Sequence, residues 1–127
     1  MDDKRIMVID DENIVGKMIK ATFEKDGYIV EKFLNAKPAL ERLKEQKFDV
    51  VITDLKMKDI DGMEVLKIIK KESPSTKVIM ITAFASMDTS LEAFRKKADD
   101  FFPKPVKISD LKARIHSLLA EEDDPPA

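Results

Sequence analysis

The chain has 127 residues, of which 43% are hydrophobic, a length and composition typical of one compact α/β domain. Its 23 lysine and arginine residues against 25 aspartate and glutamate residues give a net charge of -2, which argues against direct binding of nucleic acid. The absence of cysteine excludes disulfides, thiolate metal sites and thiol catalysis. No apolar run is long enough for a membrane span or resembles a signal peptide, so a cytoplasmic location is expected.

Short apolar runs alternate with longer amphipathic segments. The runs predict five strands, at residues 5–9, 28–33, 48–53, 77–82 and 99–102. Helical spacing follows each strand and predicts helices over about 14–23, from near 35, over about 63–72, over about 86–97 and over about 109–120. Ser86 and Ser109 are the expected N-caps of the last two helices. Residues 121–127, EEDDPPA, predict a disordered tail or the start of a linker after one domain at 1–120.

The predicted strands VVIT and VIMIT are apolar without alternation, as expected of strands that are covered on both faces. This pattern predicts a doubly wound parallel sheet, because right-handed crossovers place helices on both of its faces. In such a sheet a binding site forms outside the carboxyl ends of the strands. Functional residues are therefore expected where the strands end.

Polar residues that suit one site follow four of the five predicted strands. They are Asp10 and Asp11 after the first, Asp54 at the end of the third, Thr82 at the end of the fourth, and Lys104 with Pro105 after the fifth. Three crowded carboxylates repel one another unless a cation lies among them, and hard oxygen ligands favour Mg²⁺. Helix capping is an alternative role for Asp10 and Asp11. It does not explain an aspartate at the end of an apolar strand, or the lysine after the fifth.

Four segments, VIDDEN, VVITDLKMKDIDG, MITAFAS and DDFFPKP, resemble the response-regulator receiver family, and the likeness covers residues 4–120. The resemblance implies a flavodoxin-like (βα)5 fold whose five-stranded parallel sheet has the order 2-1-3-4-5, with helices on both faces. It also implies a switch of a two-component system that takes a phosphoryl group from a phosphohistidine. The donor would be a sensor histidine kinase or a phosphotransfer protein. The partner downstream would be an effector or a fused output domain, with a phosphorylation-dependent homodimer left open.

The resemblance also implies a role for each matching residue. Asp54 would be the phosphoacceptor. Mg²⁺ would bind Asp11, Asp54 and the backbone carbonyl of Lys56 directly, and Asp10 through water. Thr82 and Lys104 would bind the phosphoryl oxygens, Thr82 and Phe101 would switch the face formed by the fourth helix, fifth strand and fifth helix, and the bond before Pro105 would be cis. The chain would catalyse only its own phosphorylation and dephosphorylation.

The chain departs from the usual family pattern at Lys58, Lys97 and Phe101, where proline, glycine and tyrosine are common. Lys56 and Phe84 would flank the path of an attacking water. Neither side chain accepts a hydrogen bond from that water, so slow autodephosphorylation is expected.

Three other functions share parts of this pattern. A phosphohydrolase that forms an aspartyl phosphate generally needs a second aspartate two residues after the first, where this chain has Lys56. A flavodoxin-type FMN carrier needs a Ser/Thr/Gly-rich phosphate loop after the first strand, where this chain has DDEN. A receiver used only as an interaction module would not need all of the site positions filled. His116 is expected to be a surface residue of the fifth helix rather than a phosphocarrier.

Overall fold

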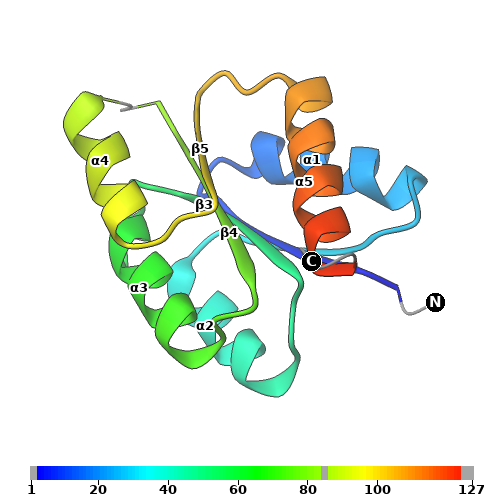
Figure 1. Ribbon diagram of the computed structural model, residues 1–127, viewed down its shortest axis with the longest axis horizontal. Helices are drawn as coiled ribbons and strands as arrows, with labels where there is room; N and C mark the ends of the chain where they lie inside the picture. Colours follow the sequence, from blue (N-terminus) through cyan, green and yellow to red (C-terminus); the bar gives the residue numbers. More distant parts are fainter. Residues whose placement is uncertain (1–2, 84–85, 124–127) are drawn as a thin grey trace.

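The computed structural model describes residues 3–83 and 86–123, in which strands and helices alternate (Figure 1). The strands are β1 (Arg5–Ile9), β2 (Ile29–Phe33), β3 (Val50–Asp54), β4 (Lys77–Thr82) and β5 (Asp100–Pro103). The helices are α1 (Asn13–Lys25), α2 (Ala36–Glu45), α3 (Gly62–Glu72), α4 (Met87–Arg95) and α5 (Ile108–Asp123). None of the helices in the described part has the length and apolarity needed to cross a membrane.

All five strands are parallel and lie in the order β2-β1-β3-β4-β5, which confirms the predicted fold. The direction of winding changes at β1. From β1 the chain first runs to β2 on one side of it, and after β2 the chain crosses to β3 on the other side of β1. The carboxyl ends of β1 and β3 therefore flank the topological switch point, where open α/β sheets bind their ligands.

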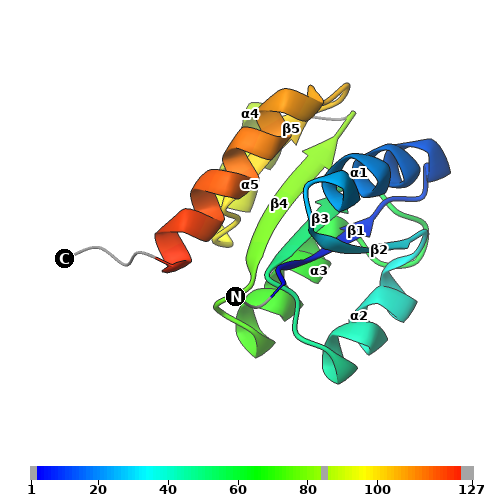
Figure 2. The ribbon, with the colours of Figure 1, turned by 90° about the vertical axis from the view of Figure 1, so that its right-hand side faces the viewer.

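The two faces of the sheet bury separate apolar clusters, because alternate residues of a strand point to opposite sides. Ile6 and Val8 of β1 pack with α1 and α5, whereas Met7 and Ile9 of the same strand pack with α2, α3 and Ala93 of α4. Figure 2 shows α1 and α5 along one side of the sheet, with α2 and α3 along the other. The central strands are covered on both faces, which explains why their sequences lack alternation.

The helix ends agree with the sequence in part. The side chain of Ser86 accepts a hydrogen bond from the N–H of Thr89, and the hydroxyl of Thr89 accepts one from the N–H of Ser86, so the predicted N-cap is confirmed as a capping box. The predicted cap at Ser109 is wrong, since α5 already begins at Ile108. Helix α5 also continues to Asp123, three residues beyond the expected end.

Candidate functional site

Asp54 is the last residue of β3, a strand whose five residues are all buried. Its residue exposure is 5%, and its Oδ1 accepts a long hydrogen bond of 3.3 Å from the backbone N–H of Lys56. Gly62 at the start of α3 leaves no room for a side chain, because an added Cβ would clash with the carbonyl oxygen of Asp54 and lie 2.7 Å from Cα of Leu55. The helix start therefore closes over the strand end, while the Asp54 carboxylate stays at the edge of the sheet.

Asp10 follows β1, the neighbour of β3, and is 1% exposed. Its Oδ1 accepts a hydrogen bond of 2.8 Å from the backbone N–H of Glu12. Its Oδ2 is buried and has no hydrogen bond of good geometry, although the ammonium of Lys104 lies 2.9 Å away as an ion pair. Burial raises the pKa of the Asp10 carboxyl above its ordinary value, against the opposing effect of Lys104. A second cation beside this oxygen would stabilise its charged form.

Lys104 follows β5 and is joined to Pro105 by a cis peptide bond. Its backbone N–H donates to the carbonyl oxygen of Thr82, which fixes the segment against the end of β4. The Lys104 side chain is 10% exposed, and its Nζ lies 2.9 Å from Oδ2 of Asp10, 2.8 Å from Oε1 of Glu12 and 3.0 Å from Oδ2 of Asp54. Desolvation opposes the charge on the ammonium, but the interactions that it makes with these carboxylates outweigh desolvation and raise the pKa of Lys104. The ammonium of Lys104 therefore stays protonated and is the cation that all three carboxylates share.

Thr82 and Phe101 lie on the side of the site towards β5. Thr82 ends β4 and is fully buried. Phe101 lies in β5 opposite Met80 in the register, is half-buried and packs against the apolar cluster beneath α2, α3 and α4. Phe94 and Phe101 also line a small cavity of about 200 Å³ beside α4. Phe84, the second residue expected to control water access, lies outside the described residues.

Of the three aspartates predicted for the site, two lie in it and one points to the outside. Asp10 and Asp54 meet at the site with Glu12, and one carboxylate oxygen from each lies within 4.8 Å of the others. Asp11, the expected direct cation ligand, is exposed and is not a member of this group. Glu12 was not singled out from the sequence, although a third acid directly after an acid pair was the available signal.

The residues present fit a hard divalent cation. Their ligand atoms are all oxygen, their carboxylates outnumber the ammonium of Lys104, and Asp10 holds a buried oxygen without a well-formed hydrogen bond. Mg²⁺ is usually bound by one or two carboxylates and completes its shell with water and phosphate oxygens. This donor set matches that preference.

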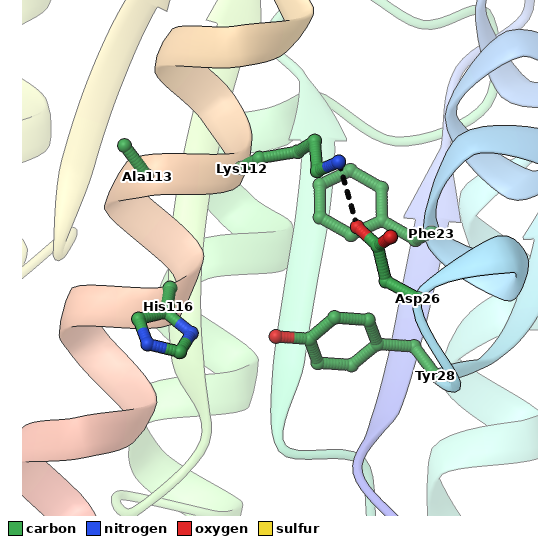
Figure 3. Close-up of a pocket in the computed structure, with 6 residues that line it drawn as sticks. All are labelled: Phe23, Asp26, Tyr28, Lys112, Ala113 and His116. Carbon is green, nitrogen blue, oxygen red and sulfur yellow. Dashed lines mark ion pairs between the residues drawn. The ribbon is translucent and has the colours of Figure 1, made fainter.

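A cavity of about 450 Å³ lies at the other end of α1, between Phe23, Tyr28 and α5 (Figure 3). An ion pair of 2.8 Å between Asp26 and Lys112 crosses its rim. His116 also lines it and is exposed, as expected of a surface residue. No residue of the acidic site contributes to this cavity, so the two places are separate.

Comparisons with known proteins agree on one family. The family model of the response regulator receiver domain matches residues 6–116. The transcriptional regulatory protein ZraR of Klebsiella oxytoca is 36% identical over 115 residues, which cover 91% of this chain and 26% of that protein. The DNA-binding transcriptional regulator NtrC of Proteus hauseri is 31% identical over 119 residues, which cover 94% of this chain and 25% of that protein. The chain therefore spans about a quarter of the length of these two curated relatives.

Solved structures give the same result. A CheY-like response regulator receiver domain protein from Methanospirillum hungatei has a TM-score of 0.94 and 31% identity, and the match covers 98% of this chain and 100% of that one. A BeF3-activated DrrB receiver domain has a TM-score of 0.87 and 29% identity, with coverage of 94% and 99%.

Proposed function

This chain belongs to the response regulator receiver domain family, the phosphorylation-activated switches of two-component systems, and from that premise we propose that it accepts a phosphoryl group on Asp54. The observation that carries the proposal is the ion pair of 3.0 Å between the Asp54 carboxylate and the ammonium of Lys104 at the carboxyl edge of the sheet. A carboxylate there is held in place by a cation that also neutralises charge on an incoming phosphoryl group.

We further propose that Mg²⁺ completes the site. Asp11 and Asp54 would bind it directly with the backbone carbonyl of Lys56, and Asp10 would bind through water. The bound ion supplies positive charge that screens the carboxylates from the phosphoryl oxygens. Asp11 is exposed and lies directly after Asp10, so its side chain would have to turn towards the site when the cation binds.

The chain's own residues then account for the transfer. An oxygen of Asp54 forms a bond to phosphorus as the bond from phosphorus to the donor breaks. A phosphohistidine donor that carries a proton on its other ring nitrogen leaves as neutral histidine, with the bonding electron pair on the nitrogen that held phosphorus, whereas a small acyl phosphate leaves as a carboxylate. Lys104 neutralises charge on the phosphoryl oxygens, and the hydroxyl of Thr82 donates to one of them. The inward movement of Thr82 leaves space for the ring of Phe101, which alters the face formed by α4, β5 and α5.

The partners follow from this role. The phosphodonor would be a sensor histidine kinase or a phosphotransfer protein in the cytoplasm. The output would be a separate effector or a fused output domain, since ZraR and NtrC are named as transcriptional regulators and this chain matches about a quarter of their length. We do not assign DNA binding to the chain itself, because its charge is -2. A homodimer that forms on phosphorylation is compatible with the same output face.

The chain would act only on its own phosphoryl group, and we expect that group to persist. Lys56 is exposed beside Asp54 and has a side chain that donates hydrogen bonds but accepts none. An in-line water next to this residue finds no general base there. Phe84 takes the other flanking position in the sequence and offers no acceptor either.

Phosphorylation by acetyl phosphate, followed on phosphate-affinity gels with and without Mg²⁺, tests the proposal. Wild type should be labelled to about one phosphoryl group per chain only with Mg²⁺. Asp54→Asn should not be labelled, yet it should remain folded in a thermal scan because it removes one of several crowded charges. The matched control is Asp26→Asn, the same change at an exposed aspartate outside the site. Labelling of Asp54→Asn, or steady turnover of phosphomonoesters by wild type, would contradict the proposal.

A further inference from the structure

Glu12 is the N-cap residue of α1, but its side chain does not cap the helix. Serine, threonine, aspartate and asparagine are favoured at this position because their short side chains accept a hydrogen bond from the first turn. The longer side chain of Glu12 instead reaches Lys104, 92 positions along the chain, at 2.8 Å. The contact with Lys104 therefore replaces the local contact that an N-cap residue usually makes.

Three carboxylates crowd the ammonium of Lys104, which donates hydrogen bonds to Glu12 and Asp54 and forms an ion pair with Asp10. An ammonium group has three N–H donors. Asp10, Glu12 and Asp54 each place one oxygen within 3.0 Å of Nζ. A phosphoryl oxygen that approaches Nζ therefore competes with carboxylate oxygens already within 3.0 Å of it, two of which accept hydrogen bonds.

The exposure of the three carboxylates identifies which one leaves. The side chains of Asp10 and Asp54 are 0% and 7% exposed, whereas that of Glu12 is 61% exposed. Asp10 is also held by the N–H of Glu12, and Asp54 is the group that carries the phosphoryl. Glu12 and Lys104 both line an open cleft of about 350 Å³ with Val15, Met18 and Pro105. Released from Lys104, the Glu12 carboxylate has solvent beside it.

We propose that Glu12 is a positioning residue that holds, in the resting protein, the hydrogen-bond donor of Lys104 that the phosphoryl group takes on activation. Its carboxylate competes with the phosphoryl group for Lys104, so it slows phosphorylation and weakens binding of phosphoryl mimics. The inference rests on the proposed function, because it requires that Lys104 contact a phosphoryl group on Asp54.

Two substitutions at this position separate competition for Lys104 from simple charge repulsion. Glu12→Gln removes the charge, whereas Glu12→Asp keeps it but favours a side chain that caps α1 instead of reaching Lys104. Both variants should be phosphorylated by acetyl phosphate about threefold to tenfold faster than wild type at saturating Mg²⁺. Both should also bind beryllofluoride more tightly by a similar factor. The control is Glu24→Gln, which removes an exposed acid from the last turn of the same helix and should match wild type.

Each outcome decides the question. Rates equal to wild type in both Glu12 variants overturn the inference while leaving phosphorylation of Asp54 intact. Acceleration by Glu12→Gln alone shows charge repulsion in place of competition for Lys104. Slower phosphorylation with weaker Mg²⁺ binding in Glu12→Gln assigns the carboxylate to the cation. A wild type that is not phosphorylated, with Asp54→Asn unchanged from it, removes the proposed function and the inference with it.

Discussion

Two acidic residues at the amino end of the parallel sheet have separate partners, whereas three at its carboxyl end share Lys104. At the amino end, Asp99 lies between the ammonium of Lys70 at 2.8 Å and the backbone N–H of Val78 at 2.7 Å. Asp100 binds the guanidinium of Arg114 at 2.6 Å. Each of these carboxylates holds a helix against the first residues of a strand.

At the carboxyl end, by contrast, Asp10, Glu12 and Asp54 surround one ammonium. Removal of an acid from a matched pair leaves a cation without its partner, which costs stability. Removal of an acid from a crowded group relieves repulsion. The difference teaches that the carboxylates at the amino end stabilise the fold through separate partners, while those at the carboxyl end are crowded, as the proposed binding of a cation and a phosphoryl group requires.

Asp99→Ala should give the largest change in stability. The side chains of Asp99 and Lys70 are 19% and 15% exposed, and the variant leaves Lys70 and the Val78 N–H without this carboxylate. We expect a loss of about 2–3 kcal/mol in the free energy of unfolding, measured in urea. Asp99→Asn, which keeps an acceptor for Val78, should lose less. A marked fall in the phosphorylation rate of Asp99→Ala, under conditions in which the variant is still folded, would contradict the division of roles between the two ends of the sheet.

Asp11→Ala should change cation binding rather than stability. If the exposed Asp11 turns into the site when Mg²⁺ binds, its loss should raise the half-saturating Mg²⁺ concentration tenfold or more, about 1.4 kcal/mol of binding free energy. A thermal-shift titration with Mg²⁺ measures this, with Asp3→Ala as the control at another exposed acid. Superimposable titration curves for wild type and Asp11→Ala would remove Asp11 from the ligand set.

The sequence was sufficient for the parts of the site that strand ends dictate. Asp10, Asp54 and Lys104 come together because the carboxyl ends of neighbouring parallel strands meet at one edge of the sheet. Glu12 was missed because its direction depends on the first turn of α1 and on a lysine 92 positions away. Which of two adjacent acids turns inward is decided by side-chain torsion angles, which residue spacing does not encode.

The ends of the helices also show that a residue type at one position does not by itself predict a cap. Ser86 caps α4 as predicted because Thr89 completes the reciprocal bonds within one turn. Ser109 does not cap α5, since the carbonyl of Lys107 already accepts from the N–H groups of Asp110 and Leu111. The helix continues to Asp123 through alanine and glutamate, which favour helix by propensity.

Asp59 shows a cap that comes from another part of the chain. Its carboxylate accepts backbone N–H bonds from Ala36 at 3.1 Å and Lys37 at 2.8 Å in the first turn of α2, and from Ile60 at 2.9 Å. Asn35, the local N-cap residue, makes no such bond. Asp59 thereby ties the loop that carries Lys56 to α2, and we expect Asp59→Ala to cost about 1 kcal/mol of stability at pH 7.

The pH dependence of that cost follows from the pKa of Asp59. Desolvation would raise this pKa, but the N–H bonds from Lys37, Ala36 and Ile60 hold it below the ordinary 3.8. A carboxyl whose pKa is lowered on folding contributes its stability above pH 3.8, and that contribution is lost as the pH falls through the folded-state value. The difference between wild type and Asp59→Ala should therefore shrink below pH 3.8. A difference that stayed constant down to pH 2 would mean that the carboxylate charge plays no part in the cap.

Lys97→Gly should give the smallest effect, and in the stabilising direction. Lys97 lies directly after the C-cap residue of α4 and has φ 69°, in the left-handed region where a Cβ is unfavourable. Glycine removes this strain but adds freedom to the unfolded chain, so the net gain should be about 0.5–1 kcal/mol. The midpoint temperature of thermal unfolding should then rise by roughly 2–3 °C.

The control for Lys97→Gly is Lys96→Gly at the preceding C-cap residue, which has φ -89° and should be destabilised by glycine. Because α4 belongs to the proposed output face and not to the acidic site, the phosphorylation rate of Lys97→Gly should equal that of wild type. A changed rate would mean that the end of α4 and the acidic site are energetically coupled even before phosphorylation.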